Sequence, residues 1–205
     1  MKINLPVLYH GTDLRIVLMT EEERKTFKEY CKKVFEYTWK LYEKYYDEIL
    51  SGKFKDVLGD AKWHNLCNAL TISSANHNGN EQYQYDSFHL TTMKFKAENY
   101  ARRAFAFGEI GLVAYCMYDA ALSLNFPIKE IEEEANHIVR FATDYGNAKP
   151  VVFEITDLDV GLLEVEGFKS LQYVIDIFGN KLGDIDLIFH YHGKINLYPS
   201  NAIYI

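Results

Sequence analysis

The chain has 205 residues, 48% of them hydrophobic and 15% aromatic, which is enough to bury the core of one folded domain. Its formal net charge of −7 excludes a broad basic field that would bind nucleic acid by bulk neutralisation of phosphates. The first residues lack the pattern of a secretion signal, and no apolar run approaches the about 20 residues that span a bilayer. We therefore expect a cytoplasmic protein with no membrane partner, folded as one domain over residues 1–205.

The three cysteines, Cys31, Cys67 and Cys116, are odd in number and far apart in the sequence. Each is surrounded by apolar residues. This pattern favours buried thiols over a disulfide framework or a zinc site.

The first elements are a short strand and a long helix. Pro6–Tyr9 is predicted to be the strand. Thr20 followed by Glu23 is a capping-box signature, so a helix is expected to begin there and to run towards Leu50, with Gly52 as its stop. Apolar residues recur near helical spacing along it: Phe27, Cys31, Val34, Leu41 and Tyr45.

A long polar stretch divides this helix from the middle of the chain. Residues Ser73–Asp86 read "SSANHNGNEQYQYD", which is long for a connection in a compact domain and is therefore a candidate binding loop. A strand "FHLTT" follows it. Three helices are then expected, over Met93–Phe107, Glu109–Leu124 and Pro127–Thr143.

Strand-like segments dominate after Pro150. They read "VVFEI", "LQYVIDI", "IDLIFHYH" and, at the end of the chain, "KINLYPSNAIYI". Helices clustered between an early strand and a mostly C-terminal sheet indicate the α+β class.

Three stretches together carry a resemblance to a known family. They are "YHGT" at Tyr9–Thr12, "FHLTT" leading into the helical "MKFKAENYA", and "PVVFEITDLD". In this order they resemble the ADP-ribosyltransferase fold of the poly(ADP-ribose) polymerase type. The resemblance covers most of the chain in element order and is specific at the first two stretches. It implies an ADP-ribosyltransferase-like split β-sheet core with inserted and flanking helices.

The resemblance also implies a set of residues that bind NAD. Gly11 would hold the nicotinamide amide through its backbone N–H and C=O, because a glycine lets the backbone approach closely. His10 would offer a ring N–H to the adenosine ribose, with Thr12 beside it. His89 stands where the family usually has tyrosine, with Thr91 in the same motif. We expect the side chains of His10 and His89 to face one cleft, and Gly11→Val to abolish NAD binding at little cost to the fold.

Other residues have both a binding and an ordinary structural interpretation. Tyr85 in the polar loop could stack on nicotinamide, but packing explains it equally well. Arg102 could reach a phosphate, although a solvated helix face is the favoured interpretation. His190 and His192 share one face of a strand, which could bind a metal. Because no third ligand is evident, simple polarity of the sheet face is favoured, and no metal is expected.

The last catalytic position is the one where this sequence departs from the family. Family members that act fast usually carry a glutamate on a late strand, where its charge stabilises the transition state. The matching position falls near Ile195 or Asn196, neither of which is acidic. We assign the position to Asn196. This leaves open slow mono-transfer, no catalysis, or catalysis by another acid among Glu109, Glu154 and Glu164.

The resulting hypothesis is an enzyme that uses NAD as a substrate and transfers ADP-ribose to a macromolecular acceptor, a protein or a nucleic acid. An alternative is an NAD-dependent RNA 2′-phosphotransferase-like enzyme, since His89 before leucine and threonine and the ending "SNAIYI" resemble that branch. A third is a non-catalytic module of the same fold that binds NAD or ADP-ribose.

Overall fold

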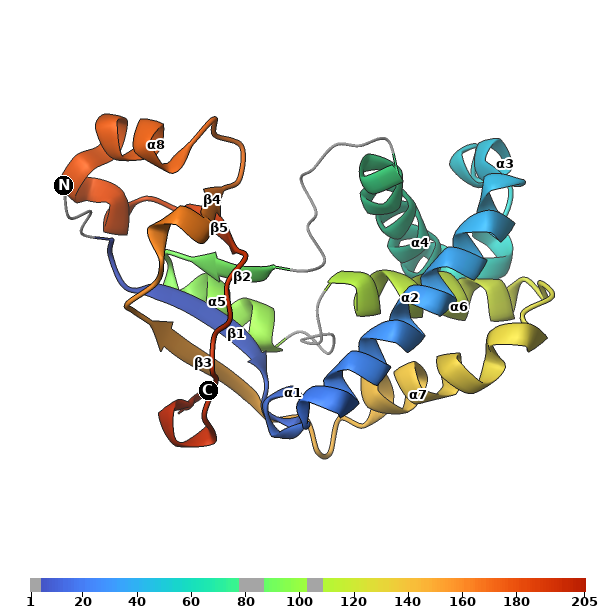
Figure 1. Cartoon of the computed structure of the whole chain (residues 1–205). Coiled ribbons are helices and arrows are strands. Elements are labelled where there is room, and N and C mark those ends of the chain that lie inside the picture. The colour runs from blue at the N-terminus through green and yellow to red at the C-terminus, as the bar shows by residue number, and fades with distance from the viewer. Residues whose placement is uncertain (1–4, 78–86, 103–108) are drawn as a thin grey trace. The chain divides into compact units, whose positions relative to one another are not determined.

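A computed structural model describes residues 5–77, 87–102 and 109–205 (Figure 1). The chain divides into two compact units. The sheet unit comprises residues 1–18, 84–106 and 146–205, and the helical unit comprises residues 19–83 and 107–145. The prediction of an α+β protein is confirmed, with helices flanking one six-stranded antiparallel sheet.

The sheet unit is built on strands in the order β4-β5-β2-β1-β3-β6. Their bounds are β1 Leu8–Asp13, β2 Phe88–Thr91, β3 Pro150–Ile155, β4 Leu163–Val165, β5 Ile188–Tyr191 and β6 Ile203–Tyr204. Every neighbouring pair is antiparallel. The predicted strands at "FHLTT", "VVFEI" and "IDLIFHYH" are therefore present, whereas the end of the chain forms only the short β6.

The sheet is joined weakly at its middle. Strands β1 and β3 pair along their whole length, from Leu8 with Ile155 to Asp13 with Pro150, and β2 pairs with β5 throughout. Between β1 and β2, in contrast, the ladder consists of the single residue pair Tyr9 with Thr91. The sheet is thus continuous, but the backbone ladder between its halves β4-β5-β2 and β1-β3-β6 consists of this one residue pair.

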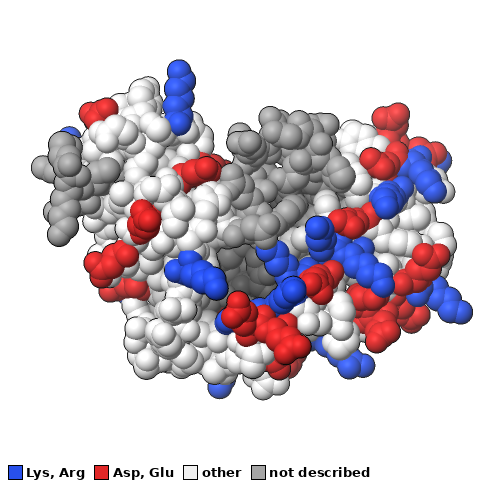
Figure 2. Space-filling model, viewed as in Figure 1, with Lys and Arg blue, Asp and Glu red and all other residues white. Residues whose placement is uncertain are grey.

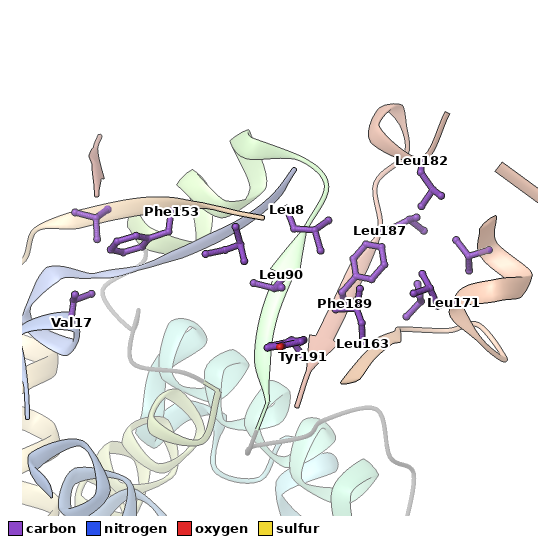
Figure 3. Close-up of a cluster of buried hydrophobic side chains, with 14 of the residues drawn as sticks. Leu8, Val17, Leu90, Phe153, Leu163, Leu171, Leu182, Leu187, Phe189 and Tyr191 are labelled. Carbon is purple, nitrogen blue, oxygen red and sulfur yellow. The ribbon is translucent and has the colours of Figure 1, made fainter. Parts of the chain in front are cut away.

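The two faces of the sheet carry different side chains, because neighbours along a strand point to opposite sides and paired residues to the same side. One face, here the core face, carries the main hydrophobic cluster of the unit, with Leu8, Leu90, Phe153 and Phe189 buried in it (Figure 3). The other, here the helix face, packs against α5 (Lys94–Arg102), with Val152 of β3 buried against Ala97 and Ala101.

One predicted strand, "LQYVIDI", is wrong. Leu171–Phe178 form helix α8, which buries Leu171 and Val174 in the core-face cluster. The hydroxyl of Ser170 caps this helix by accepting a hydrogen bond from the backbone N–H of Tyr173, and Gly179 ends it with φ of 50°. A short apolar run of this length suits a buried strand or a helix equally, and the two caps decide the outcome.

The rest of the sheet unit consists of short elements: α1 Leu14–Leu18, η2 Val160–Leu162, η3 Gly179–Asp184 and η4 Pro199–Asn201. Helix α1 begins directly after β1, where the buried Asp13 carboxylate accepts hydrogen bonds from the backbone N–H and the guanidinium of Arg15. These bonds fix the turn out of the first strand.

The helical unit contains α2 Glu21–Glu43, α3 Tyr46–Leu50, α4 Lys55–His77, α6 Glu109–Ser123, η1 Lys129–Ile131 and α7 Glu132–Thr143. Helices α2, α4 and α7 each pack against α6. The predicted capping box of Thr20 and Glu23 is confirmed at the start of α2. The predicted single helix to Leu50 is interrupted between α2 and α3, and Gly59 with φ of 72° marks a kink in α4.

Two further observations concern membrane-spanning helices and surface charge. No helix in the described ranges is long and apolar enough to cross a membrane. On the face shown in Figure 2, acidic and basic side chains are interspersed over the described residues instead of gathering by sign.

Candidate functional site

The Tyr-His-Gly-Thr motif lies inside a strand. The sequence predicts that the first strand ends at Tyr9, but β1 extends through Asp13. His10, Gly11 and Thr12 pair with Phe153, Val152 and Val151 of β3. The motif is therefore held as extended backbone by a continuous ladder on its β3 side.

Gly11 lies in close contact with the backbone of α5. An ideal Cβ built on Gly11 would lie 1.9 Å from the backbone carbonyl oxygen of Ala97 and 3.2 Å from the backbone nitrogen of Ala101. The expectation that Gly11→Val costs the fold little is therefore wrong, because any side chain here meets helix backbone. The packing of α5 by itself accounts for a glycine at this position.

The His10 ring is fixed to the neighbouring motif. Its Nδ1 lies 2.9 Å from the backbone carbonyl oxygen of His89. A carbonyl oxygen only accepts, so Nδ1 carries the hydrogen and donates it, and in the neutral ring Nε2 is left as an acceptor. Burial lowers the pKa of His10 and the bond to His89 opposes this, so the neutral ring is favoured. His10 can thus accept a hydroxyl hydrogen through Nε2, rather than donate as the sequence suggests.

The side chains of His10 and His89 do not face one cleft. Tyr9 pairs with Thr91, so His89, two residues before Thr91, lies on the helix face with Tyr9, and His10 lies on the core face. Ring contacts agree: the His10 ring meets Phe88 edge-on at 5.6 Å, and the His89 ring meets His190 at 4.6 Å. The expectation that both imidazoles hold one ligand is wrong, because the pairing of Tyr9 with Thr91 directs His10 and His89 to opposite faces. This arrangement counts against NAD binding by the full set of predicted residues.

The structure instead places His89 in a row of polar side chains across three strands. His89 on β2 pairs with His190 on β5, and His190 pairs with Glu164 on β4. The two imidazole rings pack edge to face, with an interplanar angle of 78°. Glu164 is one of the alternative acids expected from the sequence, and it shares a face with His89 through their common partner His190.

His190 is the most enclosed member of this row, with 4% of its surface exposed. Its Nδ1 lies 3.3 Å from the hydroxyl oxygen of Ser87. Its Nε2 has no hydrogen-bond partner, since the nearest carboxylate oxygen, Oε2 of Glu166, is 3.7 Å away. Burial lowers the pKa of His190 most strongly, against the opposing charges of Glu166 and Glu164.

His192 forms a second, more exposed histidine–glutamate pair. Its Nε2 lies 3.3 Å from Oε2 of Glu164, and both side chains are partly open to solvent. Across the described residues, no group of three histidine, cysteine or acidic side chains is arranged to hold a metal ion. The two histidine–glutamate pairs lie beside the edge strand β4, and each is an ion pair only when its histidine is protonated.

The remaining predicted residues have varied positions. Thr12 is buried on β1. Thr91 is buried too, and its hydroxyl accepts a hydrogen bond from the backbone N–H of Met93 at 3.1 Å, which shapes the turn into α5. Arg102 is exposed at the end of α5. Tyr85 lies outside the described residues.

The late-strand prediction is wrong in its location. Asn196 is exposed in a segment without regular structure between β5 and η4, because the final strand is limited to β6. Glu154 is exposed on β3 opposite Tyr9, and the side chain of Glu109 is outside the described part of the chain. The late strand that neighbours β2 is β5, and it presents His190 opposite His89.

His190 was not recognisable from the sequence as a member of the candidate site. The available signal was the spacing of His190 and His192 on one strand face, but strand order could not be read from it. Only the pairing of β5 with β2 and β4 adds His89 and Glu164 to that face. The resulting row contains imidazoles and carboxylates, which can exchange protons and stabilise a positive charge near neutral pH.

Comparison with protein-family models, curated proteins and solved structures gives no match to this chain.

Proposed function

We propose that this protein binds NAD where strands β1 and β2 part and transfers ADP-ribose to a macromolecular acceptor. The observation that supports the proposal most is the single residue pair between these strands. This pair falls between "YHGT" and "FHLTT", which are 79 residues apart at His10 and His89. The two motifs that suggested NAD binding are thus neighbours in space.

In this proposal His10 is the ribose-binding residue. Its Nδ1–H is used by the carbonyl of His89, so its orientation is set before a ligand arrives. The neutral Nε2 accepts a hydrogen bond from a ribose hydroxyl. His89 lies on the opposite face, so it does not bind the ribose together with His10. It belongs to the row on the helix face that contains His190 and Glu164.

The reaction requires stabilisation of positive charge on the nicotinamide ribose as its bond to nicotinamide breaks. Removal of one well-placed electrostatic group typically slows such a step by about 10²–10³-fold. The segment around Asn196 supplies no carboxylate. We assign no acid to this role, because Glu164, the acid that shares a face with the histidine row, lies on the side of the sheet opposite His10. We therefore expect slow hydrolysis of NAD when no acceptor is present.

A second candidate is a non-catalytic module that binds NAD or ADP-ribose. The exposure of Glu164 favours it, because 60% of that side chain is open to solvent, where a charge acts weakly. The RNA 2′-phosphotransferase remains a further alternative, with the exposed Arg102 available to a phosphate.

The test combines binding and turnover. Thermal shift with NAD measures binding, and mass spectrometry detects released nicotinamide in three mixtures: NAD alone, NAD with a 2′-phosphorylated RNA, and NAD with cell extract. His10→Ala should lose the NAD-induced shift. His64→Ala, which removes an exposed histidine from α4 in the helical unit, is the matched control and should keep it.

Each result selects one function. Release of nicotinamide with covalent ADP-ribose on macromolecules of the extract supports ADP-ribosyl transfer. Turnover only with the RNA selects the phosphotransferase. Binding of NAD without any product selects the non-catalytic module. Absence of any NAD-induced shift in the parent protein, or an equal shift in His10→Ala, would overturn the NAD proposal.

A further inference from the structure

The row on the helix face contains a buried histidine that the proposed function does not use. His190 is the cross-strand partner of His89, and their ring centroids are 4.6 Å apart at an interplanar angle of 78°. Cross-strand neighbours on one face restrict each other's rotamers, and edge-to-face ring pairs have a preferred geometry. The orientation of the His89 ring therefore depends directly on His190.

His190 is itself held firmly. It is buried on β5, between strands β4 and β2 on the helix face, while its neighbours Phe189 and Tyr191 are buried in the core-face cluster. The Ser87 hydroxyl lies 3.3 Å from Nδ1, and the Glu166 carboxylate faces Nε2 at 3.7 Å. A ring that is fixed on all these sides can act as a rigid support.

Stability alone does not explain a histidine at this position. A buried donor or acceptor without a hydrogen-bond partner costs about 1–3 kcal/mol, and Nε2 of His190 has none. An apolar ring of similar size would fill the same space without that cost. The imidazole is therefore better explained by an effect on its neighbours, of which His89 is the one in ring contact.

We propose that His190 is a positioning residue that fixes the ring orientation of His89, and that a change in the protonation state of His190 alters the environment of the His89 ring. A role of this positioning in catalysis rests on the proposed NAD function, whereas the coupling of the two rings does not. Other titratable groups lie near His190: Glu164 and Glu166 on the β4 side, His192 just after β5, and His89 on β2. The carboxylates favour a proton on His190, and burial and the neighbouring imidazoles oppose it.

The coupling is measured without any substrate. Long-range ¹H–¹⁵N spectra of the full-length protein, recorded from pH 5 to pH 8, report the tautomer of each histidine ring. In the parent, the His89 signals should move twice, once with its own titration and once with that of His190. In His190→Phe, which keeps a ring in the same space, the second movement should be lost.

His192→Phe is the matched control, because it removes the imidazole that directly follows β5 and forms the ion pair with Glu164. It should leave the second movement of His89 in place. His190→Asn is a further variant that keeps a polar group within reach of Ser87 and should abolish the second movement as His190→Phe does. Unchanged His89 spectra in both His190 variants would overturn the proposal.

A kinetic readout joins this inference to the proposed function. If the protein turns over NAD, His190→Phe should lower kcat by about 10-fold or more through misplacement of His89, with a smaller effect on KM. An unchanged kcat and pH profile would overturn the catalytic use of His190. If the parent does not bind NAD, the proposed function fails, and the spectra still decide whether His190 positions His89.

Discussion

The Cα atom of Gly11 on β1 lies against the backbone carbonyl of Ala97 on α5, so closely that an added Cβ would approach its oxygen to 1.9 Å. This contact seats the helix on the sheet next to the Tyr-His-Gly-Thr motif. A substitution at Gly11 is therefore expected to disturb the packing of α5, so its effect on ligand binding cannot be separated from its effect on the fold.

Gly11→Ala should destabilise the protein by about 3 kcal/mol, because α5 must move away from β1 to admit the methyl group. Urea denaturation followed by circular dichroism, with hydrogen exchange of the β1 amides to report the sheet unit, measures the change. Gly146→Ala is the control, because no atom lies within 4 Å of the added Cβ, and its unfolding curve should stay near that of the parent. Equal stability of both variants would contradict the close contact.

Acid should weaken the sheet unit. Burial lowers the pKa of both His10 and His190 from the ordinary value of 6.5. The unfolded chain therefore takes up these protons at a higher pH than the folded chain, so the stability present above pH 6.5 is lost as the pH falls below it. Hydrogen exchange of β1 and β5 amides at pH 7.5 and pH 5.5 measures this, after correction for the intrinsic exchange rate.

The control for this effect is His190→Phe, which removes one of the two buried imidazoles. Its β5 amides should lose less protection on acidification than those of the parent. A parent protein whose β1 and β5 amides are equally protected at both pH values would show that neither histidine is coupled to unfolding.

The buried cysteines should be inert in the native protein. Burial raises the pKa of the Cys31 thiol to about 12 and that of Cys116 to about 11, so neither forms appreciable thiolate at pH 8. Cys67 is only partly buried and should react first with iodoacetamide. Peptide mass spectrometry should find Cys31 and Cys116 labelled only after unfolding. Rapid labelling of Cys31 in the native protein would contradict its burial.

In the helical unit, Tyr42→Phe should cost about 0.5–1.5 kcal/mol. The fully buried Tyr42 on α2 donates a hydrogen bond from its hydroxyl to the backbone carbonyl of Met117 on α6 at 2.9 Å. Tyr37→Phe is the comparison, because the Tyr37 hydroxyl donates to the Pro127 carbonyl at a more exposed position. Thermal denaturation should show the larger loss for Tyr42→Phe, and the reverse order would contradict the buried bond.

Local signals in the sequence predicted many elements correctly. The capping box at Thr20 and Glu23 marks the start of α2 because it is a short-range hydrogen-bond pattern. The strand at Phe88–Thr91 and the α+β order were also recognisable from local periodicity. The segment Leu171–Phe178 was mistaken for a strand because a short apolar run fits both states until its caps are considered.

The candidate site was only partly predictable. The motifs containing His10 and His89 were identified through their resemblance to a known family, and the structure places them on neighbouring strands. Their opposite faces were not predictable, because a shift of one residue in register reverses the side to which every side chain points. For the same reason, the sequence pattern indicated a late strand at Asn196 in place of β5 with His190.

The sequence by itself determined the chemistry that is available: histidines in two short motifs, a glycine between a histidine and a threonine, thiols among apolar residues, and a net negative charge. These follow from residue types and local spacing. The tertiary structure alone decided which of them meet. Strand order and register are set by contacts between residues far apart in the chain, so only the folded sheet aligns His89 with His190 and Glu164 and directs Gly11 towards Ala97.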